Sequence, residues 1–131
     1  MLRAIRVFNP IVVAILRSPA HRLLSGALLL LTVTGRRSGR KFTFPVMYAP
    51  DGDDLLVFVG MHEEKQWWRN LRGGAQVTAR VRGHEEARDA ELLTGDRSAL
   101  AEPLAAYLRR FPKAEGTVKD QVVMVRLARR R

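Results

Sequence analysis

The sequence predicts a mainly β protein of the α+β class, a small six-stranded antiparallel barrel with helices at its openings. Its length of 131 residues is typical of one domain. Its apolar fraction of 47% is sufficient for a hydrophobic core. Short apolar or alternating runs, separated by turns rich in glycine and proline, are typical of antiparallel strands. Together these features predict a single domain over 1–131.

The first predicted element is a helical segment over residues 1–25, which precedes the barrel at 27–127. Asn9 is a suitable N-cap, Pro10 fits the first helical position, and Pro19 ends the run. The segment is basic and amphipathic, so it either packs on the domain or contacts a membrane surface peripherally. Its apolar run is too short to span a membrane, and no small-residue cleavage site follows. We therefore expect a cytoplasmic protein, with membrane association on the cytoplasmic side as the alternative.

The next three predicted elements are strands at 27–34, 42–49 and 55–60. The first is an apolar run ending in β-branched residues. The second contains Pro45, which has no N–H group to donate and is expected at a sheet edge or a bulge. A tight turn over 50–53 leads into the third strand. The short connections predict that these three strands form an antiparallel meander.

A short helix is expected over 63–71, where helix-forming residues precede the glycines at 73 and 74. Alternating residues at 76–82 predict a fourth strand, and a turn then leads to a fifth strand at 87–93. The last strand is expected at 121–127.

A longer helix is expected between the fifth strand and the last one. Asp96 is a typical N-cap, and the helix should extend to Arg110. Apolar residues recur along it at helical spacing, and we expect this stripe to pack in the core: Leu100, Leu104, Tyr107, Leu108 and Phe111.

The balance of charge restricts the classes of partner. Lys and Arg exceed Asp and Glu by 10, so the protein favours anions such as nucleic acid, acidic lipid or a phosphorylated small molecule. Nucleic acid is the least favoured, because only Phe42 and Phe44 beside Lys41 combine aromatic and basic character along a strand. The absence of cysteine excludes disulfides, thiolate metal sites and cysteine nucleophiles.

The densest concentration of positive charge is the turn between the first two strands. Its glycines permit a tight backbone whose N–H groups can converge on an anion, and arginine binds phosphate bidentately. The turn therefore predicts a phosphate cradle, with an exposed basic hairpin turn as the alternative. Its spacing matches neither a Walker loop nor a Rossmann fingerprint. The residues concerned are Thr34, Gly35, Arg36, Arg37, Ser38, Gly39, Arg40 and Lys41.

A second motif, Trp67-Trp68-Arg69-Asn70-Leu71, contains both tryptophans of the chain. Adjacent residues of a helix cannot share one face, so one indole is expected in the core and the other at a rim or pocket. Asn70 would bond either a loop backbone or a ligand ring. Ordinary packing is the alternative for each of these residues.

Other kinds of site are not indicated. The histidines are scattered without metal-ligand spacing, so no metal site is predicted, and His62-Glu63-Glu64 reads as a solvated loop. No hydrolase motif occurs, and no residue stands out as a general acid or base. If the protein is an enzyme, a cofactor should supply the chemistry.

The two motifs together carry a family resemblance. The run from Leu28 to Gly60, followed by WWRNL and the strand QVTARVR, resembles the deazaflavin-dependent nitroreductases and quinone reductases. Members of that family are split β-barrels related to the FMN-binding split barrels. Two departures from the family pattern are a shorter, more acidic loop at 60–64 and the lack of tyrosines in 111–116.

The resemblance implies that the cofactor is the deazaflavin coenzyme F-420, with its phosphate and glutamyl tail on the basic turn. It implies hydride transfer to a quinone-like, nitro or other activated small-molecule acceptor, by a monomer or a homodimer. An FMN-binding split barrel and a non-catalytic cofactor- or lipid-binding barrel are the alternatives. The implied cofactor-binding residues are those of the basic turn, 34–41, with Pro45, Gly60, Trp67 and Asn70.

Overall fold

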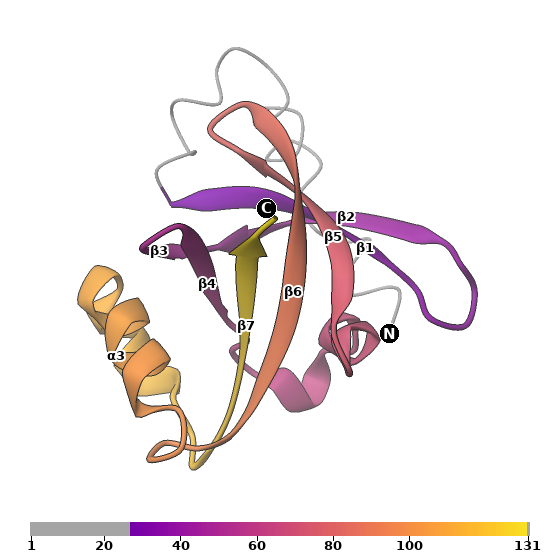
Figure 1. Ribbon diagram of the computed structural model, residues 1–131. Coiled ribbons are helices and arrows are strands. Elements are labelled where there is room, and N and C mark those ends of the chain that lie inside the picture. The colour runs from indigo at the N-terminus through magenta and orange to yellow at the C-terminus, as the bar shows by residue number, and fades with distance from the viewer. Residues whose placement is uncertain (1–26, 131) are drawn as a thin grey trace.

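The computed structural model describes residues 27–130, so the predicted helical segment at 1–25 lies outside the described residues. Seven strands form one antiparallel sheet in the order β2-β1-β5-β6-β7-β4-β3 (Figure 1). The strands are β1 (Leu28–Thr34), β2 (Lys41–Met47), β3 (Ala49–Asp51), β4 (Asp54–Phe58), β5 (Ala75–Val81), β6 (His84–Asp96) and β7 (Gln121–Arg129). The helical elements are η2 (His62–Glu64), η3 (Trp67–Leu71), α3 (Ala101–Arg110) and η4 (Pro112–Thr117).

Strands β1 and β2 form a long hairpin that projects from the rest of the sheet (Figure 1). β1 also pairs with β5, which leaves β2 as an edge strand. Pro45 lies in β2 opposite Leu30. Its missing N–H group is tolerated at the edge, and the expected edge position of this strand is confirmed.

The predicted meander of the first three strands is wrong, and the sheet has seven strands rather than six. β4 pairs with β7 and β3, and it does not pair with β2. The predicted strand at 42–49 is divided at the buried Tyr48, whose N–H donates to the carbonyl of Ala27 (3.0 Å). Beyond it, Ala49 pairs with Leu56. One continuous run in the sequence thus supplies two strands because its two halves have different partners.

Strand β6 is longer than the predicted segment at 87–93. It extends over 13 residues and pairs with β5 along its first half and with β7 along its second. The sequence did not predict the start of this strand, because the residues there are mainly charged. Arg88 is buried there, and its guanidinium donates to the Glu86 carboxylate and to the carbonyls of Asp53 and Leu127.

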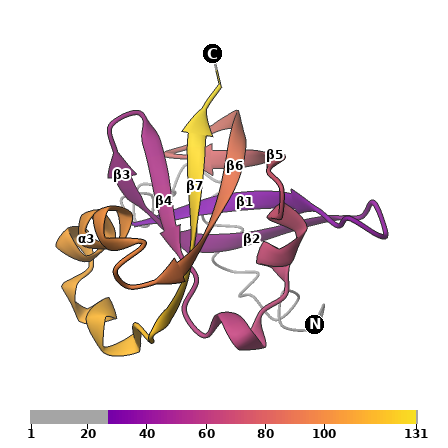
Figure 2. The same cartoon turned by 60° about the horizontal axis from the view of Figure 1, so that its bottom comes forward.

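The sheet buries apolar side chains on both faces. In β4, Leu55 and Val57 face the main core whereas Leu56 faces a second cluster beneath α3. Figure 2 shows α3 beside β3 and β4, at the far side of the molecule from the β1–β2 turn. Leu104 and Tyr107 of α3 are buried in that second cluster, so the predicted stripe does pack in the core. The helix explains why β4 and β7 are apolar without alternation.

The helical segments differ from expectation at their limits. The predicted helix at 63–71 is two short 3₁₀ segments, η2 and η3, because the chain is extended at Lys65 between them. The long helix begins at Ala101 rather than at Asp96. The Asp96 carboxylate nevertheless accepts a hydrogen bond from the N–H of Ala99 (2.8 Å) in the turn that leads into it. Within residues 27–130, no helix is both long and apolar enough to cross a membrane.

Candidate functional site

The turn at the end of the β1–β2 hairpin is closed by its own backbone. The N–H of Gly35 donates to the carbonyl of Arg40 (2.7 Å), and the N–H of Gly39 donates to the carbonyl of Gly35 (3.0 Å). Gly39 has φ of +72°. A Cβ at Gly35 would lie 2.9 Å from the Ser38 hydroxyl oxygen and 3.2 Å from the Phe42 ring, so these side chains would have to shift to admit any other residue there. The turn is therefore a defined structure rather than a loose loop.

The backbone of this turn is not the cradle of N–H groups that the sequence predicts. Besides the two glycine donors, the N–H of Arg40 donates to the Ser38 hydroxyl oxygen (3.1 Å), and that of Arg36 to the Asn70 side chain (3.0 Å). Among the described residues, only Arg37 and Ser38 keep N–H groups in the turn without an acceptor. An anion at this turn would therefore be bound mainly by the arginine side chains.

Asn70 connects the two motifs of the sequence. Its Oδ1 accepts from the N–H of Arg36, and its Nδ2 donates to the carbonyl of Trp67 (3.1 Å). Residues 34 positions apart are thereby held together. Of the two roles that the sequence leaves open for Asn70, the bond to loop backbone is the one observed.

Both tryptophans are buried, with exposed fractions of 4% for Trp67 and 6% for Trp68. Neither indole lies at an exposed rim. Trp67 packs on Phe44, with ring centroids 5.0 Å apart. Trp68 lies near the other side of η3, where its Nε1 donates to the carbonyl of His62 (2.9 Å). Each indole lines a different cavity, so packing and a pocket role coincide.

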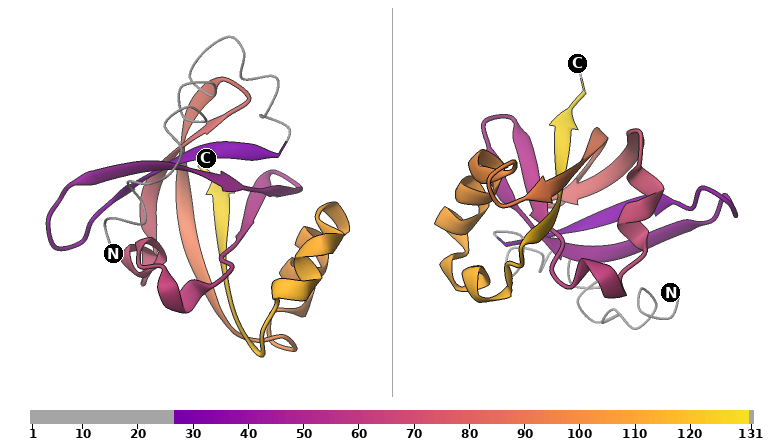
Figure 3. Two further views of the ribbon diagram at one scale, coloured as in Figure 1. Left: turned by 180° about the vertical axis from the view of Figure 1, so that it is seen from behind. Right: turned by 90° about the horizontal axis from the view of Figure 1, so that it is seen from below.

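The basic turn and η3 enclose one side of a cavity of about 800 Å³. Figure 3 shows the projecting hairpin and the segment that carries η3 from two further sides. Seven of the sequence-predicted residues line this cavity: Gly35, Arg36, Arg37, Ser38, Arg40, Trp67 and Asn70. The remaining five do not line it: Thr34, Gly39, Lys41, Pro45 and Gly60.

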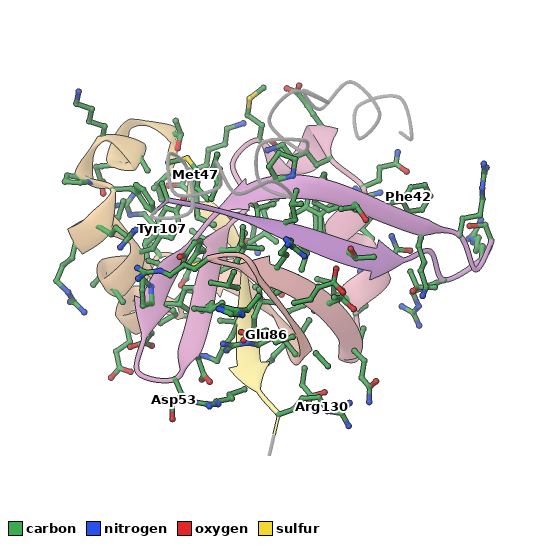
Figure 4. All side chains as sticks on the ribbon, turned by 90° about the horizontal axis from the view of Figure 1, so that it is seen from above. Phe42, Met47, Asp53, Glu86, Tyr107 and Arg130 are labelled. Atoms are coloured by element: carbon green, nitrogen blue, oxygen red, sulfur yellow. The ribbon has the colours of Figure 1, made fainter. Side chains whose placement is uncertain are left out.

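Four lining residues are not among those that the sequence singles out for the cofactor: Phe42, Gln66, Arg69 and Arg72. The last three recur every third residue along η3 and its ends. Such residues share one face in a 3₁₀ helix, which has three residues per turn. Phe42 is at the hairpin end of β2, where Figure 4 shows its ring near the tip. The period-three spacing of polar residues around the tryptophans was the available signal.

Five arginines therefore line one cavity: Arg36, Arg37, Arg40, Arg69 and Arg72. None of them forms an ion pair with a carboxylate of the described residues, although other arginines of the chain do. No Asp or Glu lines the cavity. The uncompensated charge makes the cavity strongly attractive to a polyanion, and the indole of Trp67 and the ring of Phe42 offer flat apolar surface beside it.

The loop that precedes η3 is fixed by local contacts. Glu63 pairs with Lys119 (3.0 Å between Oε1 and Nζ), and this hydrogen bond lowers the pKa of the Glu63 carboxyl. Burial lowers the pKa of the Lys65 ammonium. His62 is buried, with 9% of its surface exposed, so the expectation of a fully solvated loop at 62–64 is wrong for this residue.

Comparison with known proteins places these features in context. The sequence model of a family described as F420H(2)-dependent quinone reductase matches residues 11–125. A search of curated proteins finds no match.

Solved structures share the fold at low sequence identity. An F420-H2 dependent reductase superposes with a TM-score of 0.57 at 16% identity, over 77% of this chain and 93% of that one. A heme storage protein from Vibrio cholerae gives 0.57 at 14%, over 88% and 92%. A 5-nitroimidazole antibiotic resistance protein from Bacteroides thetaiotaomicron gives 0.51 at 13%, over 82% and 76%. At these identities the likeness establishes the fold alone.

Proposed function

Because the chain belongs to the F420H(2)-dependent quinone reductase family, an oxidoreductase family whose cofactor is coenzyme F-420, we propose that the arginine-lined cavity binds this cofactor. We further propose that the protein reduces a quinone-like acceptor. The observation that carries the proposal is the set of five arginines, unpaired with any described carboxylate, around a cavity that also contains Trp67.

The donor set fits this cofactor. A phosphate and a glutamyl tail present several negative charges along an extended chain. Arg36, Arg37 and Arg40 lie on one wall of the cavity, and Arg69 and Arg72 on the other. Guanidinium groups bind phosphate and carboxylate oxygens through paired N–H donors. The volume of about 800 Å³ is in the range of small-molecule and cofactor sites.

The proposed task of the protein is to bind and orient. When bound, the reduced deazaflavin supplies a hydride to an acceptor. The arginines hold the anionic part and thereby fix the position of the ring. Trp67, held against Phe44, offers a rigid apolar wall for a flat heterocycle. Asn70 fixes the separation between the turn and η3 and so positions both walls.

The acceptor is proposed to be a quinone or another electron-poor small molecule. Its reduction consumes one hydride and one proton, so a quinone would become a hydroquinone. No Asp or Glu lines the cavity, which leaves a solvent proton as the simplest source for the second hydrogen. Nitro compounds are the alternative acceptors within the same chemistry.

A titration tests cofactor binding. Purified protein is titrated with oxidised and reduced coenzyme F-420, and with FMN in parallel, by intrinsic tryptophan fluorescence. Because Trp67 lines the cavity, saturable quenching by F-420 is expected. Arg37→Ala should raise the Kd about tenfold, since one charge-assisted contact is lost. Arg109→Ala removes an exposed arginine from α3 and should leave the Kd within about twofold.

The results discriminate between the alternatives. Binding of FMN without F-420 would favour an FMN flavoprotein, and binding of neither would refute the assignment of the cavity. Turnover is then tested by mixing the F-420-loaded protein with menadione. Return of the oxidised cofactor's visible absorbance at a rate proportional to protein concentration is expected, and a rate equal to the protein-free control would refute the proposed reaction.

A further inference from the structure

A second cavity, of about 450 Å³, lies on the other side of η3. Its walls come from η2, η3, β6 and β7, and its floor includes the two buried rings of His62 and Trp68. These rings meet edge to face, with centroids 6.1 Å apart. The hydrogen bond from Trp68 Nε1 to the His62 carbonyl fixes the indole in place. The cavity therefore has a rigid aromatic floor.

Polar groups converge on this floor from several elements. Arg72 contributes a guanidinium, Gln121 an amide and Thr94 a hydroxyl. Thr94 and Gln121 lie on the paired strands β6 and β7. The His62 ring forms no hydrogen bond with any described residue, so its nitrogens remain for water or a ligand. A shape with one flat apolar surface and several donors at its edge matches a planar ring with an oxygen-bearing substituent.

The sign of the charge narrows the class of ligand. No Asp or Glu lines the cavity, and Arg72 forms no ion pair with the described residues. The nearby Glu63 is paired with Lys119. The Arg72 guanidinium lies 5.7 Å from the Trp68 ring centroid, so a group bound to Arg72 would extend beside the indole. The site thus favours an anion over a cation.

We propose that this cavity is a second ligand site, which takes a small planar carboxylate. The carboxylate is bound by Arg72 with help from Gln121 and Thr94, and the ring lies against Trp68. The site is separate from the arginine-lined cavity, although Arg72 lines both. The proposal does not rest on the identity of the cofactor, and it can be tested without one.

The test measures binding of 4-fluorobenzoate to the full chain by fluorine NMR, with 4-fluorobenzamide as the neutral ligand of similar shape. Saturable binding of the carboxylate is expected, with much weaker binding of the amide. Arg72→Gln should raise the Kd roughly tenfold, because a charge-assisted hydrogen bond is lost. Gln121→Leu replaces the exposed first residue of β7 and should raise the Kd for 4-fluorobenzoate a few-fold.

Arg69→Gln is the matched control. Arg69 also lies over the Trp68 ring, at 5.2 Å, but lines only the first cavity. The Arg69→Gln substitution should leave the Kd for 4-fluorobenzoate unchanged. If Arg69→Gln or Arg37→Ala weakens binding as much as Arg72→Gln, the ligand occupies the first cavity and the proposal is overturned. Absence of saturable binding, or equal binding of the neutral amide, also overturns it. Should Arg72→Gln fail to fold, Gln121→Leu alone decides between the two cavities.

Discussion

At the scale of single residues, Asn70 has the largest structural consequence for the site. It is half-buried, and its amide group bonds one backbone N–H of the turn and one backbone carbonyl of η3. No other side chain of the described residues forms a hydrogen bond between these two segments. Asn70 therefore positions the turn against η3 at the arginine-lined cavity, through the backbone groups that it bonds.

Replacing Asn70 by alanine tests this role. Without the hydrogen bond from Arg36, the turn should sample other conformations, and ordering it again would reduce affinity for coenzyme F-420 about tenfold. Amide hydrogen exchange at Arg36 should become faster in the ligand-free protein. Gln66→Ala, which removes the other lining amide, is the control and should leave that exchange unchanged. Unaltered exchange in Asn70→Ala would contradict the positioning role.

At the scale of elements, the turn before α3 differs from a simple helix start. Asp96 accepts from the N–H of Ala99, and the N–H of Leu100 donates to the Asp96 carbonyl (3.2 Å). The helix itself begins at Ala101. Asp96 therefore fixes the connection between β6 and α3, and through it the helix that covers Leu56 and Met124.

Asp96→Ala should lower the free energy of unfolding by about 1 kcal/mol, the usual cost of losing a side-chain cap. Chemical denaturation with circular dichroism would measure this change. Asp96→Asn retains an oxygen acceptor and should lose only a fraction of that amount. Cofactor affinity should be the same in all three proteins, because α3 lies far from the β1–β2 turn (Figure 2). Equal stability of Asp96→Ala and the natural protein would contradict the capping role.

At the scale of the whole molecule, the excess of positive charge is distributed unequally. Near the end of the chain, Arg126 pairs with Asp51 and Asp54, and Arg129 with Asp53. Burial alone would lower the pKa of Arg126, but the hydrogen bonds that its guanidinium donates to the Asp51 and Asp54 carboxylates outweigh burial and raise this pKa. The arginines of the cavity have no such partners among the described residues. Five arginines without a carboxylate partner among the described residues therefore concentrate positive charge at the cavity, where it can attract a polyanion.

Binding of F-420 should consequently depend on ionic strength. Raising sodium chloride from about 0.05 to 0.5 M shortens the Debye length about threefold and should raise the Kd by more than tenfold. Fluorescence titrations at a series of salt concentrations would measure this dependence. The double variant Arg36→Gln, Arg37→Gln should show a shallower dependence, and Arg109→Gln the same dependence as the natural protein. An affinity independent of salt would contradict an electrostatic role for the arginines.

Local patterns in the sequence were sufficient to predict much of the fold and of the candidate site of this protein. They determined the class of fold, the edge position of the strand with Pro45, the buried stripe of α3 and the two motifs that meet at the cavity. Each depends on properties of neighbouring residues, such as a missing N–H group, an apolar period or a cluster of like charges. The resemblance carried by the same motifs agrees with the family found by comparison.

The tertiary structure decided which strands pair and which groups remain free to bind. The pairing of β4 with β7 is a contact between distant segments, which the short connections along the chain do not reveal. The fold also brings Gln66, Arg69 and Arg72, from η3 and its two ends, to the lining of the arginine-lined cavity. The N–H groups of the basic turn are largely used by its own carbonyl and side-chain oxygens and by Asn70. Hydrogen-bond partners depend on the positions of both groups in space, so only the folded chain shows that most N–H groups of the turn are already bonded and that its arginine side chains have no carboxylate partner among the described residues.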